Sequence, residues 1–312
     1  MQDISTILTL LDLPRYGRKT VRWLLTKYDS WPNQDADDIQ KYLLSISDWP
    51  KNPGIPSRET IQKSIENTKS ILEKIGELNL NYISVFSDLY PKQLRSISDP
   101  PIILYIKGNF STLDQKKFVA VIGTREPTIY GEKSAEQFGR RMAEAGFGVV
   151  SGLALGCDSM GHIGCLKGHG ITIAVLAGGL DAIYPAKNEY LAYEILSKGG
   201  CLVSEYPPGV RAHPSHFVER DRIQSGLSTA VIVVETDIKG GTMHTVKACI
   251  EQHRLLACLS HPNKYLYESK TRGNQTLIAE KKATPIATNQ DLEMFIFAIQ
   301  NVSNMDNIDR YI

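Results

Sequence analysis

Glycine and basic residues recur where predicted strands end, in a pattern suited to phosphate recognition. The first such loop is Gly123-Thr124-Arg125, and the second begins with Ser151-Gly152. Glycine allows backbone amides to approach an anion closely, and the N-terminus of a following helix adds further N–H donors. Arginine can bind a phosphate through two parallel N–H groups. These loops therefore predict a site for the phosphates of a nucleotide or of a nucleic acid.

Two further loops carry the same residue types. They are Gly178-Gly179 with Tyr184, Lys187 and Asn188 downstream, and Lys239-Gly240-Gly241-Thr242. Each loop alone is explained by tight packing between a strand and a helix. Four of them at one edge of a sheet, with Arg125, Lys187, Arg220 and Arg222 nearby, instead predict a trough lined by amides and cations.

Aromatic and acidic residues belong to the same predicted edge. The aromatic side chains in its loops are Tyr184, Tyr206 and Phe217. Two interpretations of them stay open, namely that they cap the core or that they stack on nucleic-acid bases. Glu205 and Glu235 end strands at the mouth of the trough, where we expect them to orient Arg220 or Arg222 by charge pairing.

The elements that must position these residues begin near residue 117, where β-branched runs alternate with helical patterns. The predicted strands are Val119–Gly123, Gly148–Ser151, Ile171–Ala177, Cys201–Glu205, Ala230–Glu235 and Leu255–Ser260. The predicted helices are Tyr130–Ala145, Asp158–Gly168, Glu189–Lys198, Phe217–Leu227 and Thr242–His253. Strands that are apolar throughout and alternate with helices predict a parallel, doubly wound α/β sheet, which binds ligands beyond the carboxyl ends of its strands.

The N-terminal part has a different pattern, typical of a small helical domain. Two short helices flank the turn Pro14-Arg15-Tyr16-Gly17, a third is expected over 38–46, and an amphipathic helix is expected over 58–80. We therefore expect a helical domain over residues 1–80, an α/β domain over 81–300 and a C-terminal tail over 301–312.

Composition excludes several classes of protein. The 312 residues include 35 Lys and Arg, 34 Asp and Glu, and five scattered cysteines, for a net charge of +1. This balance excludes a uniformly basic coat, although a local basic groove remains compatible with it. We expect a cytoplasmic protein without a membrane span, secretion signal or disulfide framework. The GxGxxG and GxxxxGK[ST] motifs are absent, which disfavours NAD use and P-loop hydrolysis.

Ordered matches along nearly the whole chain resemble the DprA/Smf family of DNA-processing proteins. They are Leu13-Pro14-Arg15-Tyr16-Gly17, Asp88-Leu89-Tyr90-Pro91, Val121-Ile122-Gly123-Thr124-Arg125 with Tyr130-Gly131, Ser151-Gly152-Leu153-Ala154 through Asp158 and His162, Val175 to Asn188, Arg220-Asp221-Arg222, Gly240-Gly241-Thr242 with Thr245, and Gly273-Asn274. The resemblance implies an extended Rossmann-like, mostly parallel sheet preceded by a helix-hairpin-helix or SAM-like domain, with no winged helix after it.

The resemblance also implies a function. The protein would protect single-stranded DNA, help to load a RecA-type recombinase in transformation or recombination, and form a homodimer. It implies no catalytic residue, metal or cofactor. The DNA-binding residues that it implies are Gly123, Thr124, Arg125, Ser151, Gly152, Gly178, Gly179, Tyr184, Lys187, Asn188, Phe217, Arg220, Arg222, Lys239, Gly240, Gly241 and Thr242. Asp221 stands where the family has asparagine, and Gly240 where it has serine.

Two other functions stay open for a chain of this superfamily. One is an enzyme that processes nucleotides, although the loop at Gly240-Gly241-Thr242 lacks the glutamate of the P-G-G-x-G-T-x-x-E motif. The other is a sensor of a signal nucleotide, as in some phage-defence systems with the same fold. Cys157, His162, Cys165 and His169 do not have the usual spacing of metal ligands, so we expect them to be structural.

Overall fold

The α/β part of the protein is built around a central sheet. The computed structural model describes residues 3–28, 30–32, 34–115 and 117–308. Within these residues the sheet has nine strands in the order β1-β2-β6-β5-β4-β3-β7-β8-β9. The strands from β3 to β9 pair in parallel, whereas β1–β2 and β2–β6 are antiparallel. The expected mostly parallel, doubly wound α/β fold is therefore confirmed.

The strands of the predicted α/β region lie within a residue or two of their expected positions. Their bounds are β3 Phe118–Ile122, β4 Gly148–Ser151, β5 Thr172–Leu176, β6 Cys201–Ser204, β7 Ala230–Val233 and β8 Leu255–Leu259. Each side chain of β3 is buried because helices cover both faces of the sheet. Apolar runs of this kind are what made the strands predictable from sequence.

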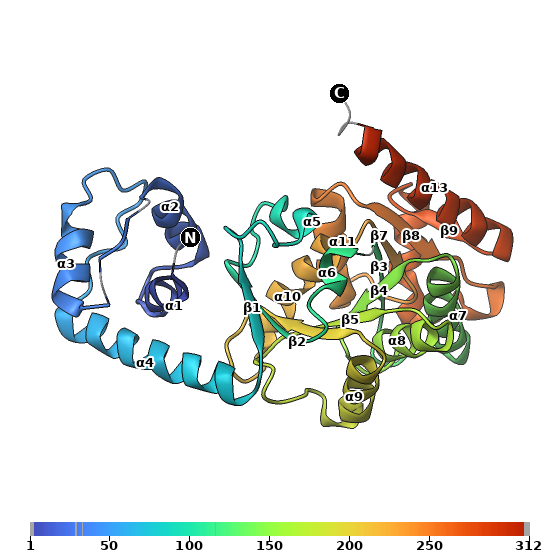
Figure 1. Ribbon diagram of the computed structural model, residues 1–312. Helices are drawn as coiled ribbons and strands as arrows, with labels where there is room; N and C mark the ends of the chain where they lie inside the picture. The colour runs from blue at the N-terminus through green and yellow to red at the C-terminus, as the bar shows by residue number, and fades with distance from the viewer. Residues whose placement is uncertain (1–2, 29, 33, 116, 309–312) are drawn as a thin grey trace.

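Helices on the two faces separate the core into layers (Figure 1). Val119 and Val121 pack with α7 (Ile129–Glu144), α8 (Cys157–Lys167) and α13 (Asn289–Ile308). The alternate residues Ala120 and Ile122 pack with α11 (Thr242–Glu251) and α12 (Arg272–Ala279) on the other face. This alternation follows from the pleat of the strand, which directs successive side chains to opposite faces.

Two more helices complete the α/β region. They are α9 (Glu189–Ser197), which packs on β5 and β6, and α10 (Pro214–Gly226), which packs on α11. α10 begins where Pro214 occupies the first helical turn and the His213 side chain caps the helix, three residues before the predicted start at Phe217.

Four helices form the N-terminal domain, which Figure 1 shows beside the β1 end of the sheet. They are α1 (Ile4–Asp12), α2 (Arg18–Lys27), α3 (Ala36–Ser45) and α4 (Arg58–Glu77). α4 leads directly into β1, so the expected boundary near residue 80 coincides with the passage from helices to sheet. The side chains of Ile7, Val21 and Leu24 are fully buried in this domain.

Several short or edge elements were not expected from sequence. They are β1 Asn81–Ser84, β2 Ile103–Gly108, β9 Thr284–Ile286, α5 Lys92–Arg95 and α6 Thr112–Gln115, together with the 3-10 turns η1 Ala186–Asn188, η2 Asn263–Tyr265 and η3 Ser269–Thr271. Helix α13 crosses the expected boundary at residue 300, and residues 309–312 of the expected tail lie outside the described residues.

The order of the strands reverses next to β3. From β3 the chain builds outward through β4, β5 and β6, then returns to place β7 on the other side of β3. The loops that leave β3 and β7 therefore diverge and open a crevice at the carboxyl end of the sheet. No helix in the described part of the chain is long and apolar enough to span a bilayer.

Candidate functional site

A pocket of about 470 Å³ lies where the loops after β3 and β7 diverge. The predicted site residues that line it are Gly123, Thr124, Arg125, Phe217, Arg220, Gly240, Gly241 and Thr242. We call it the switch-point pocket and define it by these residues together with Glu126, Asp158, Asp221, Asp237, Ser269 and Lys270. The structure thus brings the first and fourth predicted glycine loops together.

The loop after β3 is fixed by contacts that only glycine allows. A Cβ atom on Gly123 would lie 2.5 Å from the Cys157 sulfur, so any other residue would force the loop away from α8. The next residue, Thr124, donates its amide to the Glu235 carbonyl at 2.8 Å, and its carbonyl accepts from the Cys157 amide at 3.1 Å. These bonds hold the backbone of the loop firmly against two neighbouring elements.

The opposite wall of the pocket is the start of α11. Gly240 packs closely against Thr236, whereas a Cβ on Gly241 would meet open space. No side chain caps α11, and its first turn contains no acidic residue. The amides of Met243 and His244 already donate to the Gly240 and Gly241 carbonyls at 3.0 Å, so this end of α11 offers an anion chiefly the positive end of the helix dipole.

Arg125 provides the exposed cation of the pocket. Among the described residues it forms no ion pair, and its guanidinium lies 5.2 Å from the centroid of the Phe217 ring. The Phe217 ring in turn lies 5.7 Å from the ring of Tyr184. A guanidinium next to two aromatic rings can bind a phosphate while the rings contact an attached base.

Arg220 lies beneath the pocket and is only 4% exposed. Its Nη1 donates to the Val175 carbonyl at 3.1 Å, and its Nε lies 3.4 Å from Asp221 Oδ1. A Cβ on Gly152 would overlap the guanidinium, so the glycine of the second predicted loop is required by Arg220. Arg220 therefore supplies positive potential to the pocket floor while most of its own surface is covered by protein.

Two buried carboxyl groups face this arginine. Burial raises the pKa of Asp158, and the charge of Arg220 partly opposes that shift. Burial likewise raises the pKa of Asp221 to about 6, against the opposing charge of Arg220. The pocket therefore contains carboxyl groups that lose negative charge near neutral pH more readily than exposed ones do.

Other predicted residues lie outside the pocket and have structural contacts. Ser151 donates its hydroxyl to the Val121 carbonyl at 2.7 Å, and Asn188 donates to the Leu153 carbonyl at 2.7 Å. Gly178 and Gly179 pack against the backbone of residues 207–212, which is why a side chain would not fit there. Tyr184, Lys187 and Lys239 are exposed and do not line the pocket.

Arg222 is not brought to the pocket, although it is two residues from Arg220. Its Nη2 lies 2.8 Å from both carboxylate oxygens of Glu205, and its Nε donates to the Asp99 carbonyl at 2.7 Å. Residues two apart on a helix point about 200° apart, so α10 directs the two arginines to opposite sides. The expectation that Glu205 pairs with an arginine is confirmed.

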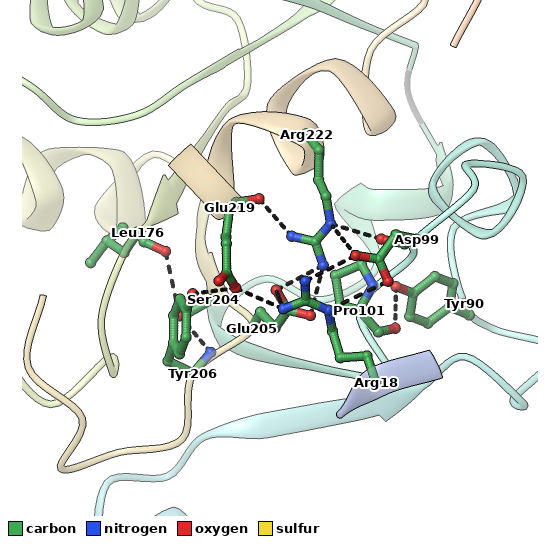
Figure 2. A network of polar contacts seen from close by, with 10 residues as sticks. All are labelled: Arg18, Tyr90, Asp99, Pro101, Leu176, Ser204, Glu205, Tyr206, Glu219 and Arg222. Carbon is green, nitrogen blue, oxygen red and sulfur yellow. Dashed lines mark hydrogen bonds and ion pairs between the residues drawn. The ribbon is translucent and has the colours of Figure 1, made fainter. Parts of the chain in front are cut away.

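Arg18 of α2 completes this second set of charges, as Figure 2 shows. It contacts Asp99 at 2.9 Å, Glu219 at 2.7 Å and Glu205 at 3.5 Å. We call Arg18, Asp99, Glu205, Glu219 and Arg222 the arginine network. It links the N-terminal helices to the sheet and to α10, and burial raises the pKa of Glu205 despite both arginines.

Glu235 has a different role from the one expected. It pairs with neither Arg220 nor Arg222, but accepts from the Thr128 amide at 2.7 Å and lies 3.2 Å from His261 Nε2. These hydrogen bonds lower the pKa of Glu235 against the opposing effect of burial. Glu235 therefore anchors the start of α7, next to the loop that carries Arg125.

The histidine and cysteine cluster of α8 is buried. Burial lowers the pKa of His162 to about 3, and its Nδ1 lies 2.6 Å from the Thr172 hydroxyl. Cys157 and Cys165 are fully buried, and burial raises the pKa of Cys157. Among the described residues no group of His, Cys, Asp and Glu side chains is arranged to hold a metal ion.

Part of the pocket wall was not predicted from the sequence. Lys270 and Ser269 come from η3, and Lys270 donates to the Glu126 carbonyl at 2.7 Å. Their signal in the sequence is weak, because no glycine loop or strand end marks them. Glu126 and Asp237 also line the pocket, directly after Arg125 and two residues after Glu235. They lie close in sequence to residues that were identified.

The fold and this site define an extended Rossmann-like α/β protein with a pocket at its switch point that is lined by both basic and acidic side chains. The chain belongs to the DNA recombination-mediator protein A family, whose model matches residues 81–296. It is 38% identical over 197 residues to the DNA processing protein DprA of Bacillus subtilis, covering 63% of this chain and 66% of that protein. It is 37% identical over 201 residues to protein Smf of Escherichia coli, covering 64% and 53%. These matches span about half to two thirds of the relatives' length.

Two solved structures extend the comparison. DprA of Streptococcus pneumoniae superposes with a TM-score of 0.72 at 26% identity, covering 93% of both chains. DNA processing protein A of Helicobacter pylori superposes with a TM-score of 0.59 at 28% identity, covering 74% of this chain and 98% of that one. The work on the H. pylori protein concerns its single-stranded DNA binding mode.

Proposed function

We propose that this protein binds single-stranded DNA, with a backbone phosphate in the switch-point pocket. The observation that carries the proposal is Arg125, which forms no ion pair among the described residues and lies against Phe217 at the mouth of the pocket. A phosphate bound there also meets the first turn of α11, which has no acidic residue. Membership of the family and the single-stranded DNA binding of the H. pylori protein support the same function.

In this proposal the pocket residues have distinct roles. Arg125 and Lys270 contact phosphate directly, and Arg220 strengthens the potential from below. Gly123 and Gly241 let the backbone approach the phosphate closely. Phe217 and Tyr184 stack on bases, which gives binding that tolerates any sequence. Arg222 has no part in it, because its donors are already used within the protein.

The cellular role follows from the family. We propose a cytoplasmic homodimer that protects single-stranded DNA and helps a RecA-type recombinase to load on it during transformation or recombination. We propose binding and not catalysis, because His162 is fully buried and hydrogen-bonded to Thr172. A group bonded in this way is poorly placed to transfer protons to a ligand.

Filter binding of single-stranded and duplex oligonucleotides at two salt concentrations tests this function. We expect the single strand to bind more tightly, with affinity that falls as salt rises. Arg125→Ala should weaken binding to every sequence and reduce the salt slope by about one. The control is Arg140→Ala, which removes an exposed arginine from α7 that is paired with Glu144. An unchanged slope in Arg125→Ala would remove Arg125 from the phosphate path.

A small nucleotide is the second candidate ligand. The pocket volume of about 470 Å³ lies within the range of small-molecule sites, and the Asp221 carboxyl in its wall could accept hydrogen bonds from a base. A nucleoside phosphate that raises Tm, with no shift from oligonucleotides, would favour this function. Release of base and ribose phosphate would show that the protein is an enzyme.

A further inference from the structure

A second groove, of about 800 Å³, lies on the N-terminal domain. One wall is the turn between α1 and α2, and the other is formed by residues 51–53. The walls are tied together because Tyr16, which is 2% exposed, donates its hydroxyl to the Gly54 carbonyl at 3.2 Å. Gly54 in turn donates its amide to Asn52 Oδ1 at 2.8 Å. The groove is therefore a fixed feature of the folded domain.

Three exposed cations line this turn groove, which we define by Arg15, Lys19 and Lys51. In the part of the chain that the structure describes, none of the three forms an ion pair. The carboxylate in the lining is Asp99, and Arg18 and Arg222 already contact it. The groove therefore has an excess of positive charge, which can be neutralised by an anionic ligand.

The backbone at Arg15 gives a second indication of function. Its φ of +69° lies in the left-handed region, which is unfavourable for a residue with a Cβ atom. Glycine would adopt this conformation without that cost. The Arg15 Nη1 atom would lie only 3.8 Å from a Cβ on Gly54, so its charge is at the groove wall. Strain of this kind concentrates at functional sites.

We propose that the turn groove binds backbone phosphates of the same DNA single strand that occupies the switch-point pocket. This inference rests on the proposed function and adds a second contact region to it. Arg18 lines the groove and contacts Glu219 on α10, while Phe217 and Arg220 of α10 line the pocket. The two sites therefore lie on either side of one helix, and a strand that crosses it reaches both.

The test compares two oligothymidines, one of about 6 nucleotides that fills a single site and one of about 30 that can span both. The variant is Arg15→Gly, which removes the cation and suits the observed φ, so its Tm should not fall. We expect its affinity for the long strand to fall roughly three- to tenfold, with a salt slope smaller by about 0.7. Binding of the short strand should stay unchanged. The double variant Lys19→Ala/Lys51→Ala should have the larger effect.

Lys69→Ala is the matched control, because it removes an exposed lysine of the same domain from α4, away from the groove. Equal long-strand affinity in Arg15→Gly and wild type, with both strands bound, overturns the inference and leaves the proposed function intact. If the wild type binds neither strand, the inference about the turn groove and the proposed function are both wrong. Arg15-dependent sedimentation with anionic lipid vesicles, without an effect on DNA, would also overturn it in favour of a membrane surface.

Discussion

The switch-point pocket and the arginine network contain the same kinds of side chain, but their arginines differ in whether they are paired with carboxylates. In the network, Arg222 has both Glu205 oxygens at 2.8 Å and Arg18 contacts three carboxylates. In the pocket, Arg125 rests on the Phe217 ring and forms no ion pair among the described residues. Both regions contain arginines and carboxylates, and what differs is that among the described residues no carboxylate lies within ion-pair distance of Arg125, which is therefore left for a ligand.

The contrast is sharpest along α10. Arg220 and Arg222 are two residues apart, yet one lies under the pocket and the other inside the network. Because the two side chains leave opposite sides of the helix, the network can fix α10 while the pocket side remains open to solvent. We therefore expect the first region to contribute stability and the second to contribute binding.

The largest expected effect is on stability, in Arg222→Ala. Glu205 is 9% exposed at its side chain, and within the described part of the chain it would keep only Arg18 at 3.5 Å as an ionic partner. Leaving a buried charge without its partner costs about 3 kcal/mol or more. We expect that loss in the free energy of unfolding, measured with urea. The DNA affinity of the protein that remains folded should not change.

The opposite result for Arg222→Ala would contradict the separation of stability from DNA binding. If Arg222→Ala keeps wild-type stability but loses DNA binding, Arg222 acts in the pocket and the division between the two regions is wrong. Arg140→Ala serves as the control here as well, since its exposed pair with Glu144 is worth at most about 0.5 kcal/mol.

The next effect concerns pH and Asp221. Its folded-state pKa of about 6 is above the ordinary value of 3.8, chiefly because of burial. The folded protein therefore binds this proton more readily than the unfolded chain, so stability from this group falls as pH rises from about 4 to about 6. Asp221→Asn should lack that dependence in urea unfolding measured across this window.

DNA affinity should also depend on pH through protonation of Asp221. Protonation of Asp221 removes a negative charge from the pocket that contains Arg125 and Arg220, so wild-type binding should tighten from pH 7 to pH 5. Asp221→Asn should bind several-fold more tightly than wild type at pH 7 and depend less on pH. Fluorescence anisotropy with oligothymidine measures both. Parallel pH profiles for the two proteins would mean that Asp221 does not face the phosphate.

The smallest effect is expected for Glu219→Gln. Its carboxylate contacts Arg18 at 2.7 Å but is 40% exposed, so solvent screens the pair. We expect a loss below about 1 kcal/mol in urea unfolding and no change in DNA binding. If Glu219→Gln lowers the free energy of unfolding as much as Arg222→Ala does, the exposed pair between Arg18 and Glu219 contributes as much stability as the buried pair between Arg222 and Glu205.

Much of the fold was predictable because its signals are local. The six strands from β3 to β8 are apolar throughout, and residues such as Gly123 and Gly241 mark the loops that follow or precede a helix. The edge strands β1 and β9 were missed because their side chains are partly exposed. β2 lies inside the sheet and its first four residues are buried, but it lies upstream of the strand–helix alternation that identified the other strands. α10 was found, but its buried face contains Arg220 and Gln224, so no apolar stripe showed which side faces the sheet.

The sequence by itself determined the α/β framework and the glycine loops at the strand ends, because each depends on residues close together in the chain. Only the tertiary structure decided which arginines stay available. The partners of Arg222 and Arg18 come from Asp99, Glu205 and Glu219, and the contact between Arg18 and Glu219 joins residues 201 positions apart. Charge pairing over such separations depends on the packed positions of helices and strands, which no local pattern specifies.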